Sequence, residues 1–170
     1  MHPRKSRMGD NMRENHKQND SDFTKLFSEP QKLLALYNML SGSQYPLDSS
    51  LKIMELPNSY FADRQNDICF EIDNIIVVIS LQSTISENLA LRLFMILARF
   101  YDTYLYDSNI YARNLINIPR PEIIVLYTGN DDFPKERTLK LSDSFKGGGG
   151  DIELEVKVLD SKGLREEIVI

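Results

Sequence analysis

The sequence predicts an α/β domain with a mixed sheet that contains a central hairpin and is flanked by helices. Residues 66–84 first alternate between polar and apolar side chains and then run apolar, as two paired strands do. Residues 89–104 carry apolar side chains at helical spacing, which indicates a helix packed on the sheet. With 170 residues, 42% of them apolar, the chain can bury one compact core. We expect a single domain over residues 21–170 and a disordered polar tail over residues 1–20.

The composition argues against several classes of protein. The one cysteine is Cys69, which excludes an internal disulfide and suits a reducing, cytoplasmic location. Both histidines, His2 and His16, lie in the polar tail, which argues against a histidine-based zinc site or triad. No apolar run reaches the ~18–20 residues that span a bilayer, and the first residues lack the apolar core of a secretory signal. We therefore expect a cytoplasmic protein with no membrane contact.

The net charge of −5 bears on nucleic acid as a partner. Nonspecific attraction to DNA requires a basic footprint, which an acidic chain lacks overall. A metal-dependent nuclease nevertheless carries acidic residues at its site and can keep its basic patch local. Five basic side chains near the start could form such a patch, although a solvated tail is the commoner reading: Arg4, Lys5, Arg7, Arg13 and Lys17.

Three helices are expected. The first covers residues 22–27, and the second runs from Pro30 to a stop at Gly42. The third follows a cap at Ser86 or at Glu87-Asn88. Its apolar stripe, which we interpret as core packing against the sheet, consists of Leu89, Leu93, Ile96, Leu97, Phe100 and Tyr104.

Three further strands are expected, over residues 51–56, 123–127 and 152–158. Pro119 and Pro121 precede the second of them, and the third alternates so that one of its faces is solvated. Residues 131–140 resemble a loop. The four glycines at 147–150 form a flexible link, because the Lys-Ser/Thr pair of a phosphate-binding loop does not follow them.

A two-residue turn at Asp73-Asn74 would fix the register of the hairpin. Cross-strand partners must then sum to the same number, so Asp67 faces Ser80 across the strands. Because side chains alternate, one wholly apolar face must be buried: Ile68, Phe70, Ile72, Ile75, Val77, Ile79 and Leu81. The other, polar face carries Asp67, Glu71, Ser80 and Gln82. Opposite Cβ atoms lie about 4.5–5.5 Å apart, close enough for two side chains to share one cation.

Asp67 is the candidate metal ligand. A Mg²⁺ ion that activates water for phosphodiester cleavage is usually held by one or two carboxylates together with water and phosphate oxygens. The residue opposite Asp67 is Ser80, whose hydroxyl is a poor neutral ligand. Glu71 lies further along the strand and could contribute only by a bent or water-mediated route. Local hydrogen bonding by a strand-edge carboxylate is an equally open role for Asp67.

The segment Asn66–Phe70, followed by Gln82-Ser83-Thr84 and then by Asn88 and Arg92, resembles the PD-(D/E)XK nuclease family transposases, which are recombination-promoting nucleases. Further stretches are similar in the same order, at residues 22–27, 119–122, 126–129, 141–145 and 155–158. The likeness thus covers nearly everything from Asp22 to Val158. The Gln-Ser-Thr run after a buried strand is its most specific element.

The resemblance implies a restriction-endonuclease-like core and a DNA endonuclease, associated with mobile elements, that uses Mg²⁺ or Mn²⁺. In that family an Asp and a Glu hold the metal, and a Gln two residues after the Glu replaces the usual Lys. Asp67 stands at the position of the Asp, Gln82 at the catalytic Gln, and Ser80 where the family has its Glu. Because the second carboxylate is missing, cleavage is expected to be weak or lost. Family members also continue past Ile170, so we expect part of a C-terminal region to be missing.

Three functions stay open on the sequence. The first is a nuclease-fold protein with weak or lost cleavage, and the second is a non-catalytic DNA- or protein-binding module that retains the fold. The third is an active enzyme whose missing acid comes from Asp22, Glu71 or Glu87. Asn88 and Arg92 are candidate substrate contacts, with a helix cap and a surface ion pair as their alternative, structural roles.

Overall fold

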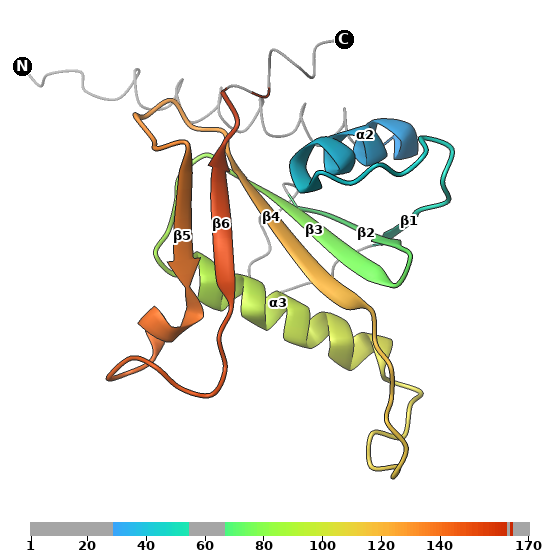
Figure 1. The fold of residues 1–170 in the computed structure, drawn as a ribbon. Helices are drawn as coiled ribbons and strands as arrows, with labels where there is room; N and C mark the ends of the chain where they lie inside the picture. Colours follow the sequence, from blue (N-terminus) through green and yellow to red (C-terminus); the bar gives the residue numbers. More distant parts are fainter. Residues whose placement is uncertain (1–28, 55–66, 163, 165–170) are drawn as a thin grey trace, which may run out of the picture.

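A computed structural model of the chain describes residues 29–54, 67–162 and 164, in which a six-stranded mixed sheet lies between two helices (Figure 1). The elements are α2 (Pro30–Ser41), β1 (Lys52–Met54), β2 (Asp67–Ile72), β3 (Ile75–Gln82), α3 (Leu89–Tyr104), β4 (Arg120–Tyr127), β5 (Glu136–Lys140), the short 3-10 helix η1 (Leu141–Ser144) and β6 (Glu155–Asp160). The expected α/β class and mixed sheet are confirmed. The expected helix at 22–27 and the polar tail lie outside the described residues.

The strand order is β1-β2-β3-β4-β6-β5. The β3–β4 and β4–β6 pairs are parallel, and the remaining pairs are antiparallel. Parallel neighbours cannot be joined by a tight turn, and α3 supplies the crossover from β3 to β4. Because β3, β4 and β6 run in the same direction, their carboxyl ends meet at one edge of the sheet.

The hairpin between β2 and β3 turns at Asp73-Asn74 as predicted. Both residues have positive φ, 47° for Asp73 and 59° for Asn74, the backbone of a type I′ turn. The predicted register is confirmed, with Ile72 paired to Ile75 at the turn and Asp67 paired to Ser80 at the open end. The short polar side chains of Asp and Asn tolerate this left-handed conformation better than other non-glycine residues.

The two helices cover opposite faces of the sheet. The face expected to be apolar packs under α2 in one core: Leu33, Leu34, Tyr37, Ile68, Phe70, Ile72, Val77, Ile79, Leu81 and Leu126. Five residues of the predicted α3 stripe pack on the other face, against Val125, Val156 and Val158 and against Cys69, Ile76 and Val78. The sixth, Tyr104, was wrongly placed in the core, since it is 44% exposed at the end of the helix. Gly42 ends α2 in the left-handed conformation, with φ 72°. Within the described ranges no helix is long and apolar enough to cross a membrane.

One strand was expected to be a loop, and two other strands begin at different residues than predicted. Residues 136–140 form the edge strand β5 and not a loop, paired antiparallel with β6. Strand β4 begins at Arg120, so Pro121 lies inside it. Strand β6 begins at Glu155, three residues later than the alternating pattern suggested.

Pro121 is tolerated in β4 because of the direction of its nitrogen. The Arg120 N–H donates to the Asn74 carbonyl on the β3 side, at 2.8 Å. The nitrogen of the next residue therefore points to the opposite edge. There, β4 pairs with β6 only from Val125 onward, so the missing N–H of proline removes no ladder hydrogen bond.

Candidate functional site

The candidate residues Asp67, Ser80 and Gln82 lie at the open end of the β2–β3 hairpin, on the face that α3 covers. The cross-strand pairing was predicted correctly, but the expectation that this face is polar was wrong. Between the polar positions, Cys69, Ile76 and Val78 form a buried cluster with Leu97 and Phe100 of α3. Ser80 itself is 1% exposed, whereas Asp67 and Gln82 are half-buried. The hairpin is therefore buried on both faces, as strands inside an α/β sheet are.

A continuous chain of hydrogen bonds connects β2, β3 and α3. The Ser80 hydroxyl donates to Asp67 Oδ1 at 2.6 Å, and the Gln82 amide donates to Ser80 Oγ at 2.8 Å. At the far end, the Arg92 guanidinium donates to Gln82 Oε1 at 3.4 Å. Each donor faces an acceptor, so the chain has one consistent direction from Arg92 to Asp67. Buried polar groups require such partners, and Ser80 uses its oxygen as both donor and acceptor.

The side chains present do not fit a divalent-cation site. Asp67 supplies the one carboxylate in this hydrogen-bonded network, and one of its oxygens already accepts a hydrogen bond from the Ser80 hydroxyl. Gln82 directs its NH₂ group, which cannot bind a cation, toward Ser80. Among the described residues there is no group of three or more His, Cys, Asp or Glu side chains that could hold a metal ion. Mg²⁺ prefers anionic oxygen ligands, and this arrangement offers too few.

The candidate replacement acids do not complete the site. Glu71 pairs with Ile76 near the turn, four residues along β2 from Asp67, which is roughly 13 Å at ~3.3 Å per residue. Glu87 is exposed, and one of its carboxylate oxygens lies 2.5 Å from the Arg137 guanidinium. Asp22 lies outside the described residues. The structure therefore brings Asp67 together with Ser80 and Gln82 and with neither Glu71 nor Glu87.

Asn88 and Arg92 occupy the first turns of α3. Asn88 is the N-cap residue, but its side chain makes no capping hydrogen bond, and its own N–H donates to the Ser86 hydroxyl at 3.2 Å. The Asn88 carbonyl accepts the Arg92 N–H at 3.0 Å. Arg92 is half-buried and directs its guanidinium at Gln82, which places it in the candidate site.

The thiol nearest to the site is unsuited to nucleophilic chemistry. Cys69 lies on β2, two residues from Asp67, and its side chain is buried. Burial raises the pKa of this thiol to about 12, and the nearby carboxylates of Asp67 and Glu71 add to the increase. Because the thiolate is the reactive form of cysteine, Cys69 is a packing residue at neutral pH.

Two further polar residues extend the site, and sequence reasoning missed them. Gln82, Tyr127 and Asp160 stand side by side on β3, β4 and β6 at the carboxyl ends of the parallel strands. Burial is the main cause of the raised pKa of Tyr127, and the carboxylates of Asp131 and Asp160 raise this pKa further. The carboxyl edge of parallel strands is where α/β proteins commonly bind ligands. The signal that could have found this row is the strand order, which a single sequence does not show.

Gly129 lies two residues after the end of β4, close to the Tyr127 ring. A Cβ atom at this position would overlap the ring end of Tyr127 and lie 2.5 Å from the Ser83 carbonyl oxygen. The loops after β3 and β4 therefore meet at a distance that only glycine allows. This contact fixes the Ser83 backbone directly after Gln82.

In comparisons with known proteins, no family model, no curated protein and no solved structure matches this chain.

Proposed function

We propose that this chain is a PD-(D/E)XK-type protein of the mobile-element-associated transposase family, which acts on DNA with weak or lost cleavage. The observation that carries the proposal is the cross-strand pair Asp67–Ser80, whose side chains are joined by a hydrogen bond of 2.6 Å. By resemblance, these are the positions of the family's two metal-binding acids. Gln82, at the position of the catalytic Gln, is bonded to the same hydroxyl.

The arrangement of the sheet supports the finer assignment to a restriction-endonuclease-like core. A hairpin carries the candidate acids, its second strand continues through α3 into a parallel neighbour, and helices cover both faces. The candidate residues lie toward the carboxyl end of β3, where the crossover to α3 begins. Such an arrangement presents side chains from two strands and one helix to the same position.

Serine at position 80 accounts for the weak or lost cleavage. In an intact site of this type a carboxylate would face Asp67, and the two would hold Mg²⁺ or Mn²⁺, which supplies an activated water for phosphodiester hydrolysis. Here a neutral hydroxyl takes that position and binds Asp67 directly. The pair satisfies itself without a cation, so the protein as written is expected to bind divalent ions poorly.

A second candidate function, a non-catalytic DNA- or protein-binding module, is favoured by the same chain of hydrogen bonds. Asp67, Ser80, Gln82 and Arg92 partner one another across three elements, as side chains of a structural network do. A fold kept for binding would preserve such a network after the loss of the metal.

The test restores a carboxylate opposite Asp67. We expect Ser80→Glu to improve Mn²⁺ affinity, measured by calorimetry, and plasmid nicking by roughly tenfold or more, since even outer-shell partners of metal sites have effects of 10–100-fold. Because the larger Glu can overpack a buried position, Ser80→Asp is a second variant that adds a smaller carboxylate. Ser144→Glu, at an exposed position of η1, is the control for added charge.

The double variant Ser80→Glu/Asp67→Ala should lose both gains, because it again leaves a single acid. Wild-type nicking equal to that of Ser80→Glu would show that another acid completes the site and that the centre is intact. Folded Ser80→Glu and Ser80→Asp proteins that neither bind Mn²⁺ nor cut would refute the damaged-centre proposal and favour the binding module.

A further inference from the structure

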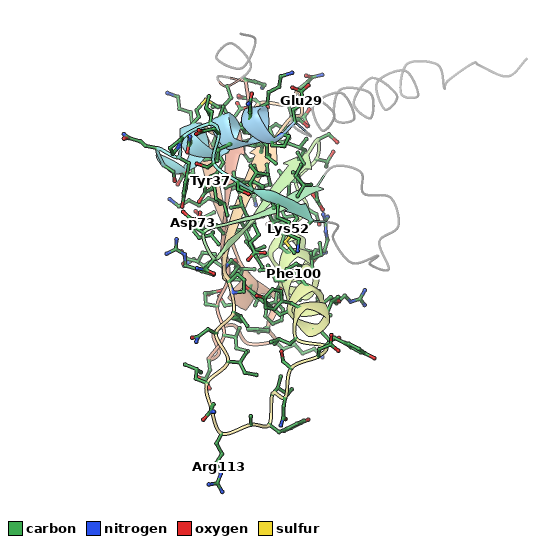
Figure 2. The ribbon with its side chains drawn as sticks, turned by 90° about the vertical axis from the view of Figure 1, so that its right-hand side faces the viewer. Glu29, Tyr37, Lys52, Asp73, Phe100 and Arg113 are labelled. Atoms are coloured by element: carbon green, nitrogen blue, oxygen red, sulfur yellow. The ribbon has the colours of Figure 1, made fainter. Side chains whose placement is uncertain are left out.

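The segment between α3 and β4, residues 105–118, projects from the body of the molecule as an arm (Figure 1). Figure 2 shows Arg113 at the far end of this arm, with its side chain pointing away from the sheet and helices. The arm contains no helix or strand, but turns order its backbone: the Ser108 N–H donates to Leu105 O at 2.8 Å, and the Ala112 N–H donates to Asn109 O at 3.0 Å. The backbone of the arm therefore contains hydrogen-bonded turns.

The base of the arm is fastened to the core. The Tyr101 hydroxyl of α3 donates to the Pro119 carbonyl at 2.6 Å, which joins the helix to the chain directly after the arm. The next residue, Arg120, donates its N–H to Asn74 O in the hairpin turn. Hydrogen bonds thus join the base of the arm to α3 and to the hairpin turn.

The arm exposes large apolar side chains to solvent. Tyr111 is 91% exposed, Leu115 88%, Tyr106 86% and Ile110 59%. With 150–250 Å² for a tyrosine and somewhat less for an aliphatic side chain, these four expose on the order of 600 Å². If two copies bury this area against each other, the interface totals about 1,200 Å², the lower end of the ~1,200–2,000 Å² of stable protein interfaces.

The charge of the arm argues against nucleic acid as its partner. Its sequence holds one acidic residue, Asp107, and one basic residue, Arg113, so it has no net charge. Affinity for DNA or RNA rests mainly on cations that neutralise phosphates, which the arm does not supply. Tyrosines exposed beside apolar side chains instead fit a protein–protein interface, in which aromatic residues are enriched and the buried core is apolar.

We propose that the arm is the contact through which two copies of this chain associate, independently of the proposed function. Interfaces of permanent partners are the more apolar ones, and a second copy is a partner that is always present at equal concentration. In a two-fold dimer the arm of one copy meets the arm of the other, and an arm without net charge does so without net repulsion. The tyrosines and Leu115 would pack between the two arms, and the two arm tips, each with an exposed Arg113, would lie near each other.

The first experiment measures the mass of the full-length protein by light scattering after gel filtration, at several micromolar concentrations. We expect a dimer for the wild type and a monomer for Tyr111→Asp and for Leu115→Asp. Leu47→Asp is the matched control, because Leu47 is a half-exposed leucine on the loop after α2 and should leave the dimer intact. A monomeric wild type, or a dimer that both arm variants retain, would overturn the proposal.

The second experiment does not depend on the folding of those variants. Cys69 is buried and is the one cysteine of the chain, so Arg113→Cys introduces a single accessible thiol. A short bismaleimide should join two Arg113→Cys chains in high yield and should join two Asp48→Cys chains, altered at an exposed position far along the sequence, only poorly. Equal yields would contradict the proposal. Arm variants that lose DNA binding at unchanged mass would identify the arm as a nucleic-acid contact instead.

Discussion

Ser80 Oγ lies 2.6 Å from Asp67 Oδ1 and donates its proton to that oxygen across the β2–β3 hairpin. Where two carboxylates stand in such a pair, their mutual repulsion favours a cation between them. The Ser80 hydroxyl introduces no such repulsion, and its hydrogen bond to Asp67 joins the two strands without a cation.

Ser80→Ala is expected to destabilise the fold by about 1–3 kcal/mol. The change removes the donor to Asp67 and the acceptor of the Gln82 amide, and it leaves both groups short of a partner in a largely buried place. Chemical denaturation of wild type and variant measures the difference. Ser144→Ala, at an exposed serine of η1, is the control and should be neutral. Equal unfolding free energies for the two variants would show that the hydrogen bonds contribute no net stability.

The hairpin and its pairing could be predicted from the sequence because parity leaves little freedom. A shift by one residue would turn Phe70 and Val77 away from the core under α2, so the apolar pattern specifies the register together with the Asp73-Asn74 turn. The same holds for the helix stripe of α3, whose spacing allows one buried face. The juxtaposition of Asp67 and Ser80 follows from that register alone.

Other features depend on contacts between distant segments, which periodicity does not encode. Strand β5 consists largely of charged and polar residues, and it is a strand because its backbone pairs with the edge of β6. Ser80 is buried because α3 covers its face of the hairpin, which the alternation within β2 and β3 could not show. Tyr127 and Asp160 join the site only through the strand order.

Gly129→Ala is expected to destabilise the protein by ~1–3 kcal/mol, the usual effect of overpacking. The new Cβ would lie 2.5 Å from the Ser83 carbonyl oxygen, and backbone cannot yield as a flexible side chain can. Thermal denaturation of Gly129→Ala measures the loss, and Asn130→Ala at the exposed neighbouring position serves as the control. A variant as stable as the control would mean that the loops after β3 and β4 separate at little cost.

Stability should decline above about pH 9. Burial, together with Glu122, raises the pKa of Tyr37 from 10.0 to about 12, and burial, together with Asp67 and Glu71, raises that of Cys69 from 9.0 to about 12. Between these values the unfolded chain loses protons that the folded chain keeps, so deprotonation favours unfolding as the pH rises. The stabilisation is complete below the unfolded pKa and is lost as the pH approaches 12.

Urea denaturation between pH 8 and pH 11 tests this dependence. Tyr37→Phe and Cys69→Val each remove one titrating group and should make the decline shallower, although Tyr37→Phe also loses the 2.6 Å hydrogen bond to Glu122 and starts from a lower stability. Leu47→Ala removes no titrating group and should leave the slope unchanged. A decline of the same steepness in all four proteins would assign the alkaline loss to other groups.

DNA binding is expected to be weak and to fall steeply with salt. The net charge of −5 repels the phosphate backbone, so attraction must come from a few local Lys and Arg side chains, each of which releases counterions on contact. Affinity for a labelled duplex, measured across a salt series, gives the slope. Tight binding that is insensitive to salt would contradict this picture.

The same salt series distinguishes the two roles of Arg92. If its guanidinium contacts a phosphate, Arg92→Gln should reduce the slope of log affinity against log salt by about one and weaken binding to all sequences alike. Lys146→Gln removes an equal charge at an exposed position after η1 and controls for net charge. The matched comparison matters because Arg92 also bonds to Gln82 at 3.4 Å. If the two variants change the slope equally while Arg92→Gln alone loses stability, Arg92 serves to position Gln82 and the DNA contact lies elsewhere.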